Sequence, residues 1–437
     1  MNHQSSPPKP ELIAKQDFWP FLLLTTLFML WGVAHNMTDT LLAAFKRIMS
    51  MTDFQTSWIQ LAFYGSYFCL ALPAALYIRK YTYKSGILLG LGLFAIGSLL
   101  FYPASITMSY GFFLFALYVL AGGLSILETA ANPYILVIGP QETATQRLNL
   151  AQSFNPIGSI MGVFLSKVFI LSKLNMAEAD DRTSMDPEAL KAIQAEELAG
   201  VMNTYVGVAL FLVFVWFVIR AVRMPVASET VEGDGVISGF RRLAKNKNYV
   251  RGVVAQFFYV GAQIGVWSFT IRYVMVELDL KESDASDYYL VALILFALSR
   301  FLFTALMKFF KPSLLLALSS LVAIACCLVV IYANGMVGVI ALVLISLCMS
   351  LMFPTIYGLS AEGLGKDTKL GGSGLIMAIL GGALITAVQG QVSDITGSIH
   401  LSYYVPLVCF VVVMYFGLSH YRRKKAKVQH PPVKMVH

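Results

Sequence analysis

Two carboxylates stand alone inside long apolar stretches of this chain. Asp39 is the only Asp, Glu, Lys or Arg in positions 18–45, and Glu128 is the only one in positions 109–139. A carboxylate at the centre of a membrane-spanning helix costs about 2.5–3.5 kcal/mol on insertion scales. Such residues usually face a water-filled cavity or a partner, and they indicate an ion or substrate pathway. The pair therefore predicts a carrier that moves a cation together with a polar solute.

Other polar residues of these stretches fall on shared helical faces. Residues three or four apart lie on one side of a helix, so Asn36 lies beside Asp39, and His35 flanks it. Asn132 follows Glu128 by one turn in the same way. Further polar or aromatic residues placed in apolar segments are Gln152, Asn155, Gln263, Trp267 and Tyr357.

The chemistry of this set suits a neutral polyol. Amide side chains present donors and acceptors in fixed geometry, and an aromatic ring suits the apolar face of a sugar. An anionic substrate would need arginines within the spans to bind it, and Arg300 is the only arginine placed deep in a span. Plainer interpretations stay open: an intramembrane amide can simply join helices, at about 0.6 kcal/mol. Glu128 can also pair statically with Arg300, and Asp39 can be hydrated near a helix end.

Composition points to a polytopic membrane protein. The chain has 437 residues, of which 57% are hydrophobic and 13% are charged, whereas soluble domains carry about 25% charged residues. The five cysteines all lie in apolar segments without metal-ligand spacing, so we expect packing residues and neither a metal nor a cofactor. The basic C-terminal tail fits anionic lipid headgroups better than nucleic acid.

Twelve apolar segments approach or exceed the roughly 20 residues that a spanning helix needs. They are 18–45, 56–78, 85–103, 109–137, 148–171, 202–222, 252–275, 288–309, 313–333, 336–361, 371–393 and 401–420. We therefore expect an all-α integral membrane protein of two six-helix bundles. The predicted parts are an N-terminal tail (1–17), the first bundle (18–222), a linker (223–249), the second bundle (250–420) and a basic tail (421–437).

The distribution of Lys and Arg predicts the membrane orientation of these parts, and an internal sequence repeat relates the two bundles. Lys and Arg concentrate in 79–84, in the linker and in the tail, which places that side and both termini in the cytoplasm. The acidic connection 172–200 then faces outward. Ala262-Gln263 repeats Ala34-His35 after 228 residues, and the Lys369 segment resembles the Arg147 segment after 222. These offsets are typical of parallel halves with a substrate site between them.

Specific motifs at these positions resemble a known family. They are LWGVAHNMTDTLL (30–42), LETAANPYILVIG (127–139), RLNLAQSFN (147–155), AQFFYVGAQIGVWSFTIRY (255–273) and FPTIYGLSAEGLGKDTK (353–369). The chain resembles the fucose–galactose–glucose–proton symporter family of the major facilitator superfamily. The resemblance implies twelve helices, a central sugar cavity and alternating access. It also implies that Asp39 and Glu128 are the acids of coupled transport.

The resemblance carries further residues and two departures. Asn36, Gln152 and Asn155 match amides of the family's first and fifth helices. The paired asparagines of fucose-transporting members are replaced here by His35-Asn36, and their Asn-Ser-Phe-Gly reads Asn155-Pro156-Ile157-Gly158 in this chain. Both changes border the expected sugar site. The choice of sugar therefore stays open between L-fucose, a related sugar, and others such as glucose or galactose.

The sequence thus predicts a proton-coupled monosaccharide symporter of the bacterial inner membrane. The alternative is a sodium-coupled symporter of glucose, galactose or another sugar. Asp39 is expected to carry the proton and Glu128 to bind the sugar and assist proton transfer; the sugar-binding set also comprises Asn36, His35, Asn132, Gln152, Asn155, Gln263, Trp267 and Tyr357. We expect a monomer whose partners are the sugar, the cation and lipids. Neither His-Glu-x-x-His nor Gly-x-Ser-x-Gly occurs, so an enzyme is not expected.

Overall fold

A computed structural model describes residues 11–48, 53–170, 185–225 and 235–423, and every regular element in these ranges is a helix. The first half contains α1 (Phe18–Ile48), α2 (Asp53–Lys80), α3 (Tyr83–Thr107), α4 (Tyr110–Val137), α5 (Ala144–Gln152), α6 (Asn155–Phe169) and α8 (Pro187–Ala221). The short α9 (Val236–Lys245) follows within the predicted linker.

The second half contains the remaining helices. They are α10 (Lys247–Leu278), α11 (Glu282–Leu306), α12 (Pro312–Tyr332), α13 (Met336–Met349), α14 (Met352–Ala361), α15 (Thr368–Met377), α16 (Gly381–Thr396), α17 (Ile399–Ser402) and α18 (Tyr404–Tyr421). Four short 3-10 turns join some of them: η1 (Lys15–Asp17), η2 (Gln141–Thr143), η4 (Gly365–Asp367) and η5 (Ala378–Leu380).

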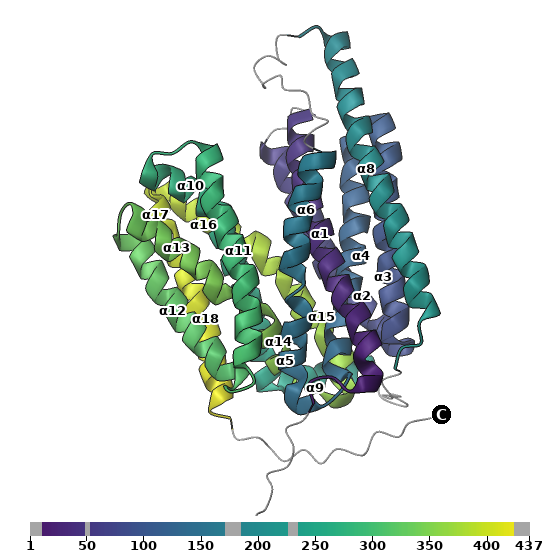
Figure 1. Ribbon diagram of the computed structural model, residues 1–437, viewed down its shortest axis with the longest axis vertical. Helices are drawn as coiled ribbons and strands as arrows, with labels where there is room; N and C mark the ends of the chain where they lie inside the picture. Colours follow the sequence, from purple (N-terminus) through teal and green to yellow (C-terminus); the bar gives the residue numbers. More distant parts are fainter. Residues whose placement is uncertain (1–10, 49–52, 171–184, 226–234, 424–437) are drawn as a thin grey trace, which may run out of the picture.

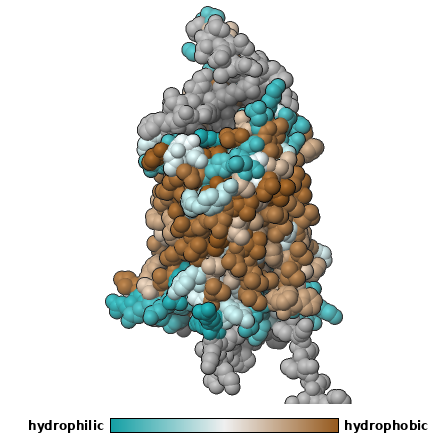
Figure 2. All heavy atoms as spheres, turned by 90° about the vertical axis from the view of Figure 1, so that its left-hand side faces the viewer, coloured by the Kyte–Doolittle hydropathy of each residue, from teal (hydrophilic) through white to brown (hydrophobic). Residues whose placement is uncertain are grey.

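The surface has the pattern of a membrane protein. Within the described ranges, 11 helical segments are long and apolar enough to cross a bilayer. The one predicted segment missing from this set is the fifth, 148–171. It is divided between α5 and α6, and neither helix alone is long enough to cross the bilayer. Figure 2 shows a broad hydrophobic band across one face, with hydrophilic side chains toward both ends of the molecule. Such a band matches the hydrocarbon layer of a bilayer.

The helices form two bundles that converge at one end. Figure 1 shows α1–α8 on one side and α10–α18 on the other, drawing together toward the end where α5, α9, α14 and α15 lie. Here α15 contacts α2 and α4, and α5 contacts α14 and α11. We call this end, defined by the contacts of α5 and α2 with the second bundle, the closed end.

Close helix contacts repeat in the two halves. A Cβ atom on Gly158 in α6 would collide with the backbone carbonyl of Met29 in α1. In the second half, a Cβ atom on Gly381 would collide with the carbonyl of Phe257 in α10. Phe257 lies 228 residues after Met29, and Gly381 lies 223 residues after Gly158. The same glycine-dependent approach therefore recurs at the predicted repeat distance, which supports two parallel halves.

Prolines divide two predicted spans. Proline has no N–H and clashes with the carbonyl four residues earlier. Pro156 stands at the start of α6, where α5 has just ended. Pro354 stands in the first turn of α14, directly after α13. The sequence predicted single segments over 148–171 and 336–361, whereas each consists of two helices.

The acidic connection also differs from the prediction. Residues 172–200 were expected to be a polar loop, but α8 already begins at Pro187. The Asp186 side chain accepts hydrogen bonds from the backbone N–H groups of Glu188 (3.2 Å) and Ala189 (3.3 Å). An N-cap carboxylate followed by proline is a strong helix start. The first part of this connection, 172–184, and much of both terminal tails lie outside the described residues.

Candidate functional site

Glu128 lies where three helices of the first bundle meet. Its side chain in α4 is buried, and its Oε1 accepts a hydrogen bond from the Tyr67 hydroxyl of α2 at 3.0 Å. The Tyr67 oxygen in turn accepts from Trp31 Nε1 of α1, also at 3.0 Å. A buried carboxylate must be hydrogen-bonded, because burying a charge without partners is costly. The tyrosine and tryptophan therefore form the local support of this acid.

Two predicted amides continue this arrangement. Asn132 Nδ2 donates to the backbone carbonyl of Glu128 at 3.0 Å, as expected one helical turn later. Gln152 Nε2, at the end of α5, donates to Asn132 Oδ1 at 2.7 Å. Both amides are buried. The predicted neighbours Glu128 and Asn132 are thus joined by Gln152 in one continuous cluster from α4 to α5.

His35 joins the cluster through aromatic contacts. Its ring stacks on Trp31, with centroids 5.6 Å apart and planes inclined by 27°. It also lies 5.3 Å from the ring of Phe63 in α2. Since Trp31 donates to Tyr67, the imidazole is connected to Glu128 through two side chains. This places His35 near Glu128, while the prediction that it flanks the Asp39 side chain and binds the sugar stays a prediction.

The other two first-half amides bond to backbone. Asn36 Nδ2 donates to the carbonyl of Gly32 in its own helix, at 3.3 Å. Asn155 Nδ2 donates across to the carbonyl of Phe28 at 3.2 Å, joining α6 to α1. Both side chains are half-buried. In this structure Asn155 therefore acts as a helix-joining amide, the plainer interpretation that the sequence left open.

The second-bundle residues form separate contacts. Trp267 Nε1 donates to Ser346 Oγ of α13 at 3.2 Å, and its ring meets Phe296 of α11 edge-on at 5.0 Å. Gln263 is half-buried one helical turn away in α10. Tyr357 of α14 is fully buried, and its hydroxyl has no hydrogen-bond partner among the described residues. None of these three is hydrogen-bonded to the Glu128 cluster within the described ranges.

Asp39 occupies the helix that the sequence predicted. Its backbone lies in α1, one turn beyond His35. Its side chain lies outside the described residues. The role of Asp39 as proton carrier therefore stays a prediction.

Arg300 reaches from the second bundle into this region. From α11 its Nη1 donates to the backbone carbonyl of Gln152 at 2.9 Å, and its Nε donates to that of Ser350 at 2.6 Å. The guanidinium carbon lies 4.6 Å from the centroid of the Phe296 ring. The static Glu128–Arg300 ion pair that the sequence left open does not form between these two described residues. The guanidinium donates hydrogen bonds to backbone carbonyls instead.

Comparison with known proteins decides the family. The sequence profile described as Major Facilitator Superfamily matches residues 21–388. The chain belongs to the Major Facilitator Superfamily. It is 40% identical over 420 residues to the L-fucose-proton symporter of Haemophilus influenzae, covering 93% of this chain and 97% of the relative. It is 32% identical over 399 residues to the glucose/galactose transporter of Brucella abortus, covering 90% and 92% respectively.

A solved structure agrees with the superfamily fold in detail. A crystal structure of the Major Facilitator Superfamily transporter FucP, in the outward conformation, superposes with a TM-score of 0.87 at 39% identity. The match covers 92% of this chain and 98% of that chain. The predicted fold of twelve membrane helices in two six-helix bundles is therefore confirmed, with two of the spans divided at prolines.

Two residues of the cluster were not predicted from the sequence. Trp31 and Tyr67 are ordinary members of apolar segments, and nothing in their spacing connects them to Glu128, which lies 61 residues beyond Tyr67. The available signal was the hydroxyl of Tyr67 inside a span, because a buried tyrosine usually needs a hydrogen-bond partner. Helical periodicity finds partners on one helix but not across helices.

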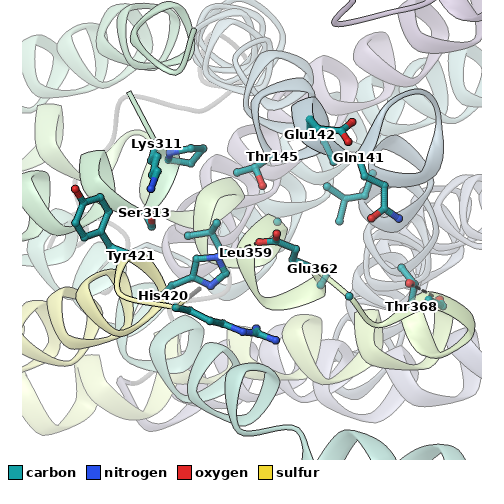
Figure 3. Close-up of a pocket in the computed structure, with 18 of the residues that line it drawn as sticks. Gln141, Glu142, Thr145, Lys311, Ser313, Leu359, Glu362, Thr368, His420 and Tyr421 are labelled. Carbon is teal, nitrogen blue, oxygen red and sulfur yellow. Dashed lines mark hydrogen bonds and ion pairs between the residues drawn. The ribbon is translucent and has the colours of Figure 1, made fainter. Parts of the chain in front are cut away.

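A pocket with a volume of about 540 Å³ lies at the closed end, between the two bundles. Figure 3 shows Gln141 and Thr145 of the first bundle facing Lys311 and Glu362 of the second. His420 Nε2 lies 2.9 Å from Glu362 Oε2. This pocket does not include any residue of the Glu128 cluster. It belongs to the junction between the bundles, not to the predicted sugar site.

The cysteines show no metal or disulfide chemistry in the described part of the chain. All five are free thiols, and four of them are buried while Cys69 is exposed. Among the residues that the structure describes, no group of three His, Cys, Asp or Glu side chains has metal-binding geometry. The four buried thiols fit the predicted role of small packing residues.

Proposed function

We propose that this superfamily member imports a monosaccharide, L-fucose or a related sugar, by proton symport. The observation that carries the proposal is the buried cluster of Glu128, Asn132 and Gln152. A carboxylate and two amides offer donors and acceptors at fixed positions, which is what a polyol requires. The similarity to curated L-fucose-proton symporters over more than nine-tenths of the chain supports the same choice.

The proposed mechanism uses the buried acids as the coupling element. Burial in an apolar surrounding disfavours the charged form of a carboxyl group. A proton taken from outside onto Asp39 neutralises the site and permits the bundles to close around the sugar. Glu128 accepts hydrogen bonds from sugar hydroxyls and takes part in passing the proton. The amides of the cluster orient the ring, while Gln263, Trp267 and Tyr357 complete the site from the second bundle.

The proposed orientation places the closed end in the cytoplasm. The end of α2 carries Arg79 and Lys80 at this side, and the positive-inside rule assigns such loops to the cytoplasm. The bundles are joined there by hydrogen bonds such as Asn149 Nδ2 to Thr355 Oγ1 at 3.2 Å. We therefore take the structure as the outward-facing state, in a bacterial inner membrane with both termini inside. We further propose a monomer that needs no cofactor and is not an enzyme.

Transport by reconstituted protein tests the proposal. Proteoliposomes with an imposed inward proton gradient should accumulate labelled L-fucose, and Asp39→Asn should abolish accumulation while leaving sugar exchange. Exchange persists because a permanently neutral site can still bind sugar and reorient. Full gradient-driven accumulation by Asp39→Asn would exclude this residue as the proton carrier.

A sodium-coupled carrier of glucose or galactose is the second candidate. The 32% identity to the glucose/galactose transporter supports these two sugars, and sodium is considered because carboxylate, amide and carbonyl oxygens are the ligands that hard cations prefer. Separate sodium and proton gradients, each tested with L-fucose, glucose and galactose, distinguish the two. Accumulation driven by sodium alone would replace the proton in the mechanism.

A further inference from the structure

Two backbone carbonyls at the junction between the bundles lose their helical partners to proline. In a helix, each carbonyl accepts from the N–H four residues later. For Gln152 that residue is Pro156, and for Ser350 it is Pro354. Proline has no N–H to give, so both carbonyls need other donors. A carbonyl left unpaired inside a membrane protein is costly.

Arg300 supplies the donor to both carbonyls. Its Nη1 bonds to the Gln152 carbonyl of the first bundle, and its Nε bonds to the Ser350 carbonyl of the second. Arg300 lies six residues before the end of α11 at Leu306, which is about 9 Å inside the helix end. A cation at such depth is costly unless it is paired. The arginine and the two carbonyls therefore satisfy one another.

The neighbouring contacts make this a junction between bundles. One turn further along α11, the Thr304 carbonyl accepts from Gln146 Nε2 of α5 at 3.0 Å. The rings of Phe301 and Phe154 meet edge-on at 5.7 Å. Ser153 Oγ lies 3.4 Å from Thr304 Oγ1. Arg300 is thus the charged part of a continuous α5–α11 contact at the closed end.

We propose that Arg300 is a positioning residue that locks the two bundles at the closed end, by binding the carbonyls that Pro156 and Pro354 release. The proposal rests on the proposed function, because it assumes that the bundles separate at this end during transport. On separation the guanidinium keeps the Ser350 carbonyl of its own bundle and loses that of Gln152. Charge-assisted hydrogen bonds are about twice as strong as neutral ones, so this single bond weights the equilibrium toward the closed state.

Alkylation of a buried thiol measures the lock directly. Ser153→Cys, made in a Cys69→Ser background, places a thiol at the α5–α11 contact, where Ser153 is fully buried. A membrane-permeant maleimide should label it only when the closed end opens. Arg300→Met should raise the labelling rate by about tenfold or more, as expected from the loss of a hydrogen bond to a charged group. Arg300→Lys should fall between the two.

Proline substitution tests the mechanism without touching the arginine. Pro156→Ala restores an N–H that can bond to the Gln152 carbonyl within its own helix, so Arg300 loses its acceptor. It should raise labelling, and the double variant with Arg300→Met should label no faster than the faster single variant. Pro103→Ala in α3 is the matched control, because α3 packs on α2, α4 and α8 of the first bundle and no hydrogen bond joins Arg300 to it among the described residues. It should leave labelling unchanged.

Each result bears on the lock alone. Unchanged labelling in Arg300→Met, or effects of the two variants that multiply, would overturn the proposal. If Arg300→Met does not yield folded protein, Pro156→Ala against Pro103→Ala still decides it. The labelling needs neither sugar nor an ion gradient. If the protein shows no proton-driven sugar uptake but the Arg300 and Pro156 variants change labelling as expected, the proposed function is refuted and the role of Arg300 at the closed end is retained.

Discussion

The two bundles differ in whether their buried amide side chains are hydrogen-bonded. In the first bundle, Asn132, Asn149 and Gln152 are buried, and each donates a hydrogen bond to another group of the protein. In the second bundle, Gln256 and Gln389 are fully buried, and neither the nitrogen nor the oxygen of either amide has a partner among the described residues. The halves share a fold but differ in how their polar interiors are satisfied.

We interpret the bonded amides of the first bundle as a pre-formed site, and the unpaired amides of the second bundle as groups that change partners during transport. A buried amide without a partner costs about 1–3 kcal/mol. Gln389 lies against Gly265 in α10, since a Cβ atom there would meet the Gln389 Oε1 atom. On the proposed function, such a costly unpaired amide is expected to find a partner in another step of the transport cycle. On the same proposal, we expect the first bundle to hold the sugar in a pre-organised site and the second to rearrange around it.

The largest effect is expected from Glu128→Gln. The substitution keeps the size of the side chain but removes its negative charge, so Tyr67 no longer donates to a carboxylate and the site no longer exchanges a proton. Gradient-driven sugar accumulation in proteoliposomes should fall by about 100-fold, the upper end for loss of a charge-assisted hydrogen bond. A variant that still accumulated sugar at the wild-type level would show that the first bundle does not carry the coupling.

The next two predictions replace a buried glutamine of each bundle, Gln152 and Gln256, by leucine. Gln152→Leu removes the donor to Asn132 in the pre-formed site and leaves the asparagine oxygen without that partner. Sugar affinity should fall by about 10–100-fold, because a site built for hydrogen bonding loses both its own bond and that to the ligand. Isothermal titration with the purified protein measures it. An unchanged affinity would place the sugar elsewhere.

Gln256→Leu is the matched substitution in the second bundle, and it should increase the stability of the protein. Replacing an unpaired buried amide by an apolar side chain of similar size removes a desolvation cost, so the free energy of unfolding should rise by about 1 kcal/mol. Thermal unfolding in detergent measures the change. Destabilisation by Gln256→Leu would mean that the Gln256 amide is hydrogen-bonded after all, and the contrast between the bundles would fail.

Sequence patterns identified what a single helix contains, but not what lies across from it. The Glu128–Asn132 pair and the six-plus-six arrangement follow from helical periodicity and hydropathy, and both were predicted. The contact of Tyr67 with Glu128 joins different helices, so no spacing rule reveals it. Prolines in the fifth and tenth spans indicate freed carbonyls, but only the packed structure shows that Arg300 serves as their donor. The early start of α8 at Pro187 was missed because the connection as a whole is acidic.

The smallest effect is expected from Trp267→Phe, and it sharpens what the second bundle contributes. The substitution removes the hydrogen bond from Trp267 Nε1 to Ser346 Oγ but keeps an aromatic ring near Phe296. Loss of one neutral hydrogen bond costs about 0.5 kcal/mol at the lower end, a two- to threefold loss of sugar affinity. Trp267→Ala removes the ring face as well and should weaken binding further in the same titration. Equal affinities in the two variants would mean that the sugar does not contact this ring, and the second bundle's contribution would then come from its amides alone.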